Sequence, residues 1–223
     1  FLQRPPLDVR SIIKEKSIRK AKGENNVAAN KLIVIEGLDG SGKATQARRL
    51  MKALMEQGIS VREVSFPDYD SDSSALVRMY LSGQFGTNPQ DVNAYAASTF
   101  YSVDRYASYK QDWGGWYEQG GLVVADRYTT SNAVHQTSKL PREQQRAFLD
   151  WLFDTEDRLL GLPKPDLVIY LDMPTEITEE MMRRRETATG THADIHEQDE
   201  TYLKNCRAAA REIVKDCGWT VIR

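Results

Sequence analysis

The stretch 31–45, KLIVIEGLDGSGKAT, constrains the fold more than any other part of the chain. Residues 32–35 form a continuous apolar run rich in β-branched side chains, which is typical of a central parallel strand covered on both faces. The pattern G-x-x-x-x-G-K follows, from Gly37 to Lys43. Glycines at such a turn let backbone N–H groups approach a polyphosphate, and the lysine adds a compact positive charge. The sequence therefore predicts a loop that binds nucleotide phosphates.

A helix is predicted directly after this loop, because Ala47, Leu50, Met51 and Leu54 recur at the spacing of one helical face. Its N-terminal dipole would point at the phosphates. We expect the whole loop to contact the phosphates of a nucleotide, which the family resemblance given below identifies as ATP; its residues are Gly37, Leu38, Asp39, Gly40, Ser41, Gly42, Lys43, Ala44 and Thr45. One residue departs from the pattern: the position after the lysine usually carries a hydroxyl that ligates Mg²⁺, and here it is alanine.

Strands and helices alternate along the rest of the chain. Further strands are predicted over 59–66, 122–126, 166–172 and 219–223, and helices over 74–81, 88–110, 141–153, from Pro174 onward, and 199–217. Such alternation indicates βαβ units. The predicted fold class is α/β, with a doubly wound, five-stranded parallel sheet of the P-loop type.

Length and charge suit one domain with a short extension. Residues 1–30 carry a net charge of +4 and a thin apolar face, so we expect a basic N-terminal extension, either a solvated tail or an arm for an anionic partner. Residues 31–223 form the predicted domain. The net charge of −2 favours neither nucleic acid nor membrane as a partner, and we identify no membrane-spanning run or signal peptide. We therefore expect a cytoplasmic protein, with Cys206 and Cys217 reduced and buried on one helix.

Five local sequences, in order, resemble the thymidylate kinase (dTMP kinase) family, particularly its bacterial members: EGLDGSGKATQ, FPDY, FYSVDR, DRYTTSN and ADIHEQD. The resemblance spans residue 31 to the C-terminus. It implies a nucleoside monophosphate kinase fold, Mg²⁺ bound with ATP, and phosphate transfer from ATP to dTMP in dTTP biosynthesis. It also implies a homodimer packed through helices, and a last helix that this chain would lack.

The resemblance places dTMP in a cleft at the C-terminal edge of the sheet. It implies that Asp39 accepts a hydrogen bond from the 3′-hydroxyl, that Tyr101 stacks on thymine and that Arg105 donates to a base carbonyl. The remaining dTMP contacts that it implies are Phe66, Pro67 after a cis peptide bond, Tyr69, Arg127, Ser131 and Asn132. On pattern alone, the favoured interpretation of Tyr101 is an aromatic residue that packs between helices.

The predicted chemistry requires positioning and charge neutralisation rather than a general base, because a nucleoside monophosphate is already close to doubly ionised at neutral pH. Lys43 and Arg127 are the expected catalytic cations. In family members with glycine at the position of Gly40, a mobile arginine comes from the lid, and here Arg183, Arg184 and Arg185 fit that role. Asp126 is expected to hold water molecules of the Mg²⁺ ion in its second coordination shell.

His135 stands where the family commonly has a tyrosine near the sugar. His135, His192 and His196 lack the spacing of metal ligands, so no metal site is assigned to them. Two other functions remain open from the sequence. One is a kinase of another deoxynucleoside monophosphate or of a nucleoside, and the other is a non-catalytic P-loop protein that binds nucleotide, which Ala44 would favour.

Overall fold

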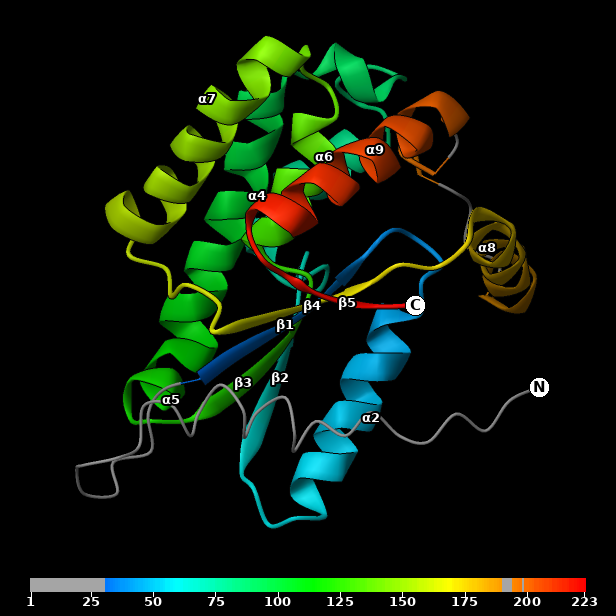
Figure 1. Ribbon diagram of the computed structural model, residues 1–223. Coiled ribbons are helices and arrows are strands. Elements are labelled where there is room, and N and C mark those ends of the chain that lie inside the picture. Colours follow the sequence, from blue (N-terminus) through cyan, green and yellow to red (C-terminus); the bar gives the residue numbers. More distant parts are fainter. Residues whose placement is uncertain (1–30, 190–193, 198) are drawn as a thin grey trace.

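A computed structural model describes residues 31–189, 194–197 and 199–223. At its centre lies a parallel sheet in the order β2-β3-β1-β4-β5 (Figure 1). The strands are β1 (Lys31–Gly37), β2 (Val61–Ser65), β3 (Leu122–Asp126), β4 (Leu167–Leu171) and β5 (Thr220–Ile222). This sheet confirms the predicted α/β class. The proposed basic extension over 1–30 and His192 lie outside the described residues.

Helices cover both faces of the sheet (Figure 1). They are α2 (Lys43–Met55), α3 (Ala75–Leu81), α4 (Ala94–Ser108), α5 (Gly114–Glu118), α6 (Thr129–Thr137), α7 (Arg142–Phe153), α8 (Thr175–Thr189) and α9 (Glu200–Asp216). Short 3₁₀ turns occur at Asp72–Ser74 and Pro89–Asp91, and π-helical turns at Tyr109–Trp113 and Asp154–Leu159.

Strand β1 is buried on both faces, as its continuous apolar run predicts. Ile33 and Ile35 pack with the apolar stripe of α2, whereas Leu32 and Val34 point to the opposite face and join a cluster that contains Trp113. Helices α6, α7 and α9 close a further core cluster above the sheet (Figure 1). Alternate residues of one strand therefore tie the two helical layers together.

The helix predicted over 88–110 begins later than expected. Asn88 and Pro89 open only a 3₁₀ turn, so the predicted start of the long helix at residue 88 is wrong. Asn93 is the N-cap of α4, and its Oδ1 atom accepts a hydrogen bond from the backbone N–H of Ala96 at 2.9 Å. Both asparagines satisfy the sequence rule for a cap, and only the tertiary packing decides which one starts the helix.

Sequence reasoning missed helix α6 altogether. Its residues, TTSNAVHQT, show no apolar stripe, yet eight of the nine are buried. A helix that is buried all round while carrying polar side chains needs internal hydrogen-bond partners, and no periodicity of the sequence reports them.

The prediction that Cys206 and Cys217 are both buried on the last helix is correct in part. Cys206, Ala210, Ile213 and Val214 are buried, but Cys217 is exposed and the prediction that it lies in the core is wrong. Cys217 follows the last helical turn, where the chain leaves the core for β5. Both cysteines are free within the part of the chain that the structure describes.

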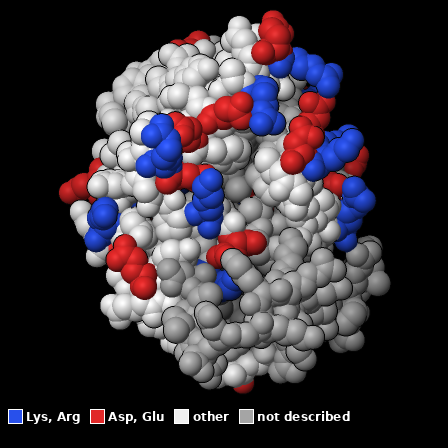
Figure 2. All heavy atoms as spheres, turned by 60° about the vertical axis from the view of Figure 1, so that its left-hand side comes forward, with Lys and Arg blue, Asp and Glu red and all other residues white. Residues whose placement is uncertain are grey.

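The surface carries mixed charge on the face shown in Figure 2, where acidic and basic side chains alternate over the described part. None of the described helices is long and apolar enough to cross a membrane.

Candidate active site

A cleft of about 1030 Å³ opens at the carboxyl ends of β1, β2 and β3. The register brings these ends together, because Asp126 of β3 pairs with Ile35 of β1 and with Ser65 of β2. The carboxyl edge of a parallel sheet is where open α/β folds bind ligands. The predicted residues that line the cleft are Asp39, Gly40, Gly42, Lys43, Ala44, Thr45, Phe66, Pro67, Tyr69, Tyr101, Arg105, Asp126, Arg127, Ser131 and Asn132.

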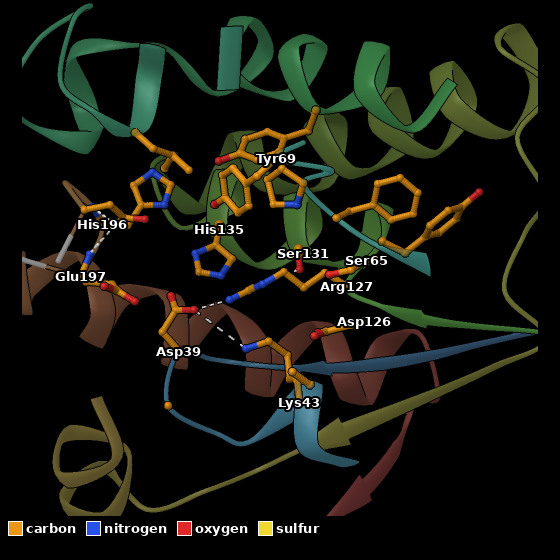
Figure 3. A pocket seen from close by; sticks show the side chains of 18 of the residues that line it. Asp39, Lys43, Ser65, Tyr69, Asp126, Arg127, Ser131, His135, His196 and Glu197 are labelled. Atoms are coloured by element: carbon orange, nitrogen blue, oxygen red, sulfur yellow. Dashed lines mark hydrogen bonds and ion pairs between the residues drawn. The ribbon is translucent and has the colours of Figure 1, made fainter. Parts of the chain in front are cut away.

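Three charged side chains meet at the floor of this cleft (Figure 3). Asp39 lies between two cations: its Oδ1 accepts a hydrogen bond from Nη2 of Arg127, and Nζ of Lys43 lies 3.9 Å from the same oxygen. Burial alone would raise the pKa of Asp39, but Arg127 and Lys43 hold it well below its usual range. The phosphate loop and the end of β3 are thereby joined by an ionised carboxylate.

Lys43 is buried at the start of α2, where Nζ donates to the carbonyl oxygen of Leu38 at 2.9 Å. Burial, together with the nearby charge of Arg127, lowers the pKa of Lys43 to about 8. A polyphosphate on this loop would favour the charged ammonium and restore a higher pKa. The lysine is thus held ready for an anionic ligand.

Arg127 adopts a left-handed backbone conformation, with φ of 66°. Its N–H donates to the carbonyl of Ile35 at 3.1 Å, and its Nη1 donates to Oγ of Ser131 at 3.3 Å. This backbone region is strained for a residue with a side chain, and such strain is typical of functional sites. Burial lowers the pKa of Arg127, but the carboxylates of Asp39 and Glu36 raise it by more. The guanidinium is therefore always charged.

One wall of the cleft comes from α4 and α6. Tyr101 and Arg105 lie on α4, one turn apart, and Ser131 and Asn132 lie in the first half of α6. Asn132 joins the two helices, because its Nδ2 donates to the carbonyl of Ser98 at 3.2 Å. The opposite wall contains Phe66 and Pro67, and the peptide bond between them is cis, as the family resemblance implies.

Gln136, which the sequence did not single out, also lines the cleft. Its side chain is 1% exposed, and among the described residues neither its amide nitrogen nor its amide oxygen has a hydrogen-bond partner. An unpaired buried amide is costly, so this side chain is suited to a ligand that offers both a donor and an acceptor. The sequence gives no signal for Gln136, because the helix that carries it has no apolar stripe.

Two histidines stack beside the same cleft. The rings of His135 and His196 lie 5.8 Å apart with an interplanar angle of 12° (Figure 3). Nε2 of His196 is 2.7 Å from the hydroxyl of Tyr80, whereas Nε2 of His135 is buried without a partner in the described part of the chain. Burial lowers the pKa of His135 to about 3 and that of His196 well below its usual range, so both rings are neutral at physiological pH.

Helix α8 packs over the phosphate loop. A side chain at Gly40 would collide with the carbonyl group of Thr178, and Met181 and Met182 line the cleft. Neither Arg183 nor Arg184 of this helix reaches the cleft: Arg183 is exposed, and Arg184 is exposed and ion-paired with Glu180.

The remaining predicted residues lie outside the lining of the cleft or outside what is described. Gly37, Leu38 and Ser41 lie in the loop behind it, and the side chain of Arg185 is not among the described ones.

The environment of Asp126 fits a hydrated metal ion. Its Oδ1 atom is buried without a hydrogen-bond partner in the described residues, and its side chain lines the cleft beside Lys43, Ala44 and Thr45. The described residues contain no group of three or more histidine, cysteine or carboxylate side chains that could hold a metal ion by themselves. An ion at this place would therefore depend on ligands from a bound nucleotide and on water.

Comparison with known proteins gives one consistent answer. A model of the family described as thymidylate kinase matches residues 35–223. The chain is 32% identical to the thymidylate kinase of Mycobacterium tuberculosis (strain H37Rv) over 190 residues, 84% of this chain and 87% of that protein. It is also 32% identical to the thymidylate kinase of Caenorhabditis elegans, over 71% of this chain and 72% of that protein.

A solved structure of thymidylate kinase from Candida albicans superposes with a TM-score of 0.63 at 26% sequence identity, covering 87% of this chain and 83% of that one. The bacterial and animal relatives are equally similar, so the matches do not separate the two types. Because the family model covers nearly the whole described domain and the relatives align over most of their length, this chain belongs to the thymidylate kinase family.

Proposed function

We infer that the protein is a thymidylate kinase, which transfers the γ-phosphate of ATP to dTMP and forms dTDP. The observation that carries this function is the Lys43–Asp39–Arg127 cluster, in which one carboxylate joins a phosphate-loop lysine to an arginine on the floor of the adjoining cleft. Two phosphate groups can thus be held close together, one by each cation. Phosphoryl transfer is catalysed by positioning and charge neutralisation, which is what such a pair supplies.

We propose that Arg127 clamps the phosphate of dTMP. Its planar guanidinium matches the oxygens of a phosphate in a two-point contact. In the ligand-free protein that edge is turned to Asp39. A dianionic phosphate would compete with the carboxylate for the guanidinium and would leave Asp39 free to accept a hydrogen bond from the sugar 3′-hydroxyl.

The base is proposed to lie against Tyr101, with its polar edge toward Arg105, Asn132 and Gln136. Thymine carries a carbonyl at position 4 where cytosine carries an amino group, so an arginine at that edge selects thymine. The unpaired amide of Gln136 offers one donor and one acceptor to the same edge. His135 is proposed to face the deoxyribose, because it lines the same cleft beside Asp39 and Arg127 (Figure 3).

We further propose a bacterial-type arrangement of the catalytic arginines. Gly40 leaves the phosphate loop without an arginine, and the run Arg183–Arg185 on α8 supplies the mobile cation. In this structure Arg183 and Arg184 point away, so a rotation of α8 on ATP binding would have to bring one of them to the cleft.

Mg²⁺ is proposed to be held by ATP and water, with Asp126 accepting hydrogen bonds from those water molecules. The bound ion would neutralise phosphate charge. Ala44 cannot ligate it, so the protein's own contribution falls to the buried Oδ1 of Asp126.

We propose that the enzyme forms a homodimer in the cytoplasm. Helix α4 exposes Val103 and Tyr106, 53% and 39% accessible, on the face that points away from the cleft residue Arg105. An exposed apolar face on a helix suits an interface between two copies. The free thiols of Cys206 and Cys217 suit a reducing compartment.

The catalytic assignment predicts that Lys43→Ala and Arg127→Ala each lower kcat/KM for dTMP by about 100- to 1000-fold, because each removes a charge that faces a reacting phosphate. Lys52→Ala and Arg158→Ala are matched controls, since both side chains are exposed and ion-paired at the surface. Steady-state kinetics on folded variants checks this. Wild-type kcat/KM in either site variant would refute the assignment.

For the metal, we expect Ala44→Ser to lower the Mg²⁺ concentration that gives half-maximal rate and Asp126→Asn to raise it. A hydroxyl at position 44 adds a ligand, whereas the amide weakens the contact to coordinated water. Calorimetric titration of Mg²⁺ into the ATP complex should show the same order of affinities. If the Ala44→Ser variant transferred phosphate and the wild-type protein did not at any Mg²⁺ concentration, the non-catalytic P-loop alternative would be supported instead.

The buried state of His135 predicts acid sensitivity. Below pH 6.5 the unfolded chain binds a proton on this imidazole, but the folded protein does so only near pH 3, so stability falls as the pH falls. His135→Gln should remove this contribution, about 2 kcal/mol at pH 5 relative to pH 7.5. Urea unfolding across pH measures it. If the free energy of unfolding fell with pH equally in the wild type and in His135→Gln between pH 6.5 and 5, the prediction would be contradicted.

The proposed dimer predicts that Val103→Arg weakens self-association by at least tenfold in sedimentation experiments, because it buries a charge in an apolar interface. Ile59→Arg is the control, since Ile59 is exposed in the turn before β2. A wild-type protein that stays monomeric at high micromolar concentration would rule the dimer out.

A further inference from the structure

A second buried carboxylate lies behind the α4–α6 wall. Glu156 is 0% exposed and belongs to the π-helical turn that follows α7. Its neighbours Asp154 and Asp157 pair with surface cations instead, with Arg158 and Lys164 respectively. Of the three acidic side chains in this π-helical turn, only that of Glu156 therefore points into the core. Such turns are frequent at functional sites.

Glu156 accepts four hydrogen bonds, which is the full capacity of a carboxylate. Nε of Arg105 donates to Oε2 at 2.7 Å, and Nη2 of Arg105 donates to Oε1. The hydroxyls of Ser102 and Thr129 donate at 2.8 and 2.5 Å. The donors come from both helices of the wall, because Ser102 and Arg105 lie on α4 and Thr129 begins α6.

This contact fixes the orientation of Arg105. A guanidinium is planar, and here the edge formed by Nε and Nη2 is occupied by the carboxylate. Arg105 lines the cleft while only 1% of the residue is exposed, so the small remaining edge, built around Nη1, is the part left to meet a ligand.

Stability alone does not explain such a pair. Removing both charges from water costs about as much free energy as their mutual attraction returns. A buried ion pair therefore often stabilises the fold no more than an apolar pair of equal volume, and what it adds is a defined geometry. A buried arginine without a partner could adopt several rotamers and so present its donors in several directions. The carboxylate of Glu156 restricts the guanidinium of Arg105 to one direction.

From this geometry we propose that Glu156 is a specificity-positioning residue. It holds the guanidinium of Arg105 so that a single edge faces the base, and it thereby sets the preference for a carbonyl over an amino group at position 4 of the pyrimidine. The inference rests on the base contact proposed above for Arg105. Glu156 itself touches no substrate.

The test compares kcat/KM for dTMP and for dCMP in folded variants. Arg105→Met should lower the dTMP/dCMP ratio by about 10- to 100-fold, the cost of one unmade buried hydrogen bond. Glu156→Gln, which keeps the volume but turns one acceptor into a donor, should lower the ratio by a similar factor and raise KM for dTMP more than it lowers kcat. The double variant should be no worse than Arg105→Met, because both changes remove the same interaction.

Matched variants separate positioning from a purely structural role. Asp157→Asn alters the adjacent acid of the same turn and should leave the ratio unchanged. Ser102→Ala removes one donor to Glu156 without touching the arginine contact, so it should lower stability but keep the ratio. If Glu156→Gln does not fold, Glu156→Asp, which keeps the charge and withdraws the carboxylate, takes its place with the same expectation.

Three different results would overturn the proposal. A wild-type ratio in Glu156→Gln or Glu156→Asp, with a lowered ratio in Arg105→Met, would show that the arginine needs no positioning. A wild-type dTMP/dCMP ratio in Arg105→Met would refute the proposed contact between Arg105 and the base, and with it the role of Glu156. It would not affect the phosphate site proposed at Lys43 and Arg127. A lowered ratio in Ser102→Ala as well would assign the effect to general loosening of the wall.

Discussion

The first turn of α6 is held by two buried carboxylates, and the cleft depends on this arrangement. Thr130 and Ser131 donate to Glu36 at the end of β1, at 2.7 and 2.8 Å, while Thr129 donates to Glu156. Negative charge is favourable at a helix N-terminus, where backbone N–H groups lack partners. The polar helix can therefore lie inside the protein, directly after the strained backbone of Arg127.

The same helix start links the sheet to the charged side chains at the floor of the cleft. Ser131 donates to Glu36 and accepts a hydrogen bond from Arg127, whose other nitrogen contacts Asp39 of the phosphate loop. Each buried charge in this chain of contacts has a partner of opposite sign or a hydroxyl donor. Asp39 contacts both Arg127 and Lys43, and Glu36 accepts hydrogen bonds from both Thr130 and Ser131, so each of these carboxylates has two partners. Two partners for each carboxylate restrict the orientation of the side chains at this end of the cleft.

The predicted site residues and the missed ones differ in the kind of signal that they carry. Lys43, Asp39 and Arg127 follow directly from short motifs at strand ends, where the topology of a parallel sheet leaves little choice of position. Gln136 and Glu156 carry no such signal. One lies on a helix without an apolar face, and the other depends on a π-helical turn that reverses which of several neighbouring acids points inward.

The sequence by itself determined the parallel α/β fold, because an apolar β-branched run followed by a glycine-rich loop and an amphipathic helix is a local pattern with few solutions. It also predicted a phosphate-binding loop, since that prediction depends on the backbone and the lysine of one segment. Only the tertiary structure decided which asparagine starts α4, that Cys217 is exposed, that α6 is buried, and how Arg105 is oriented. The orientation of Arg105 depends on Glu156, 51 residues away, and the other features depend on packing and burial, which no local periodicity can encode.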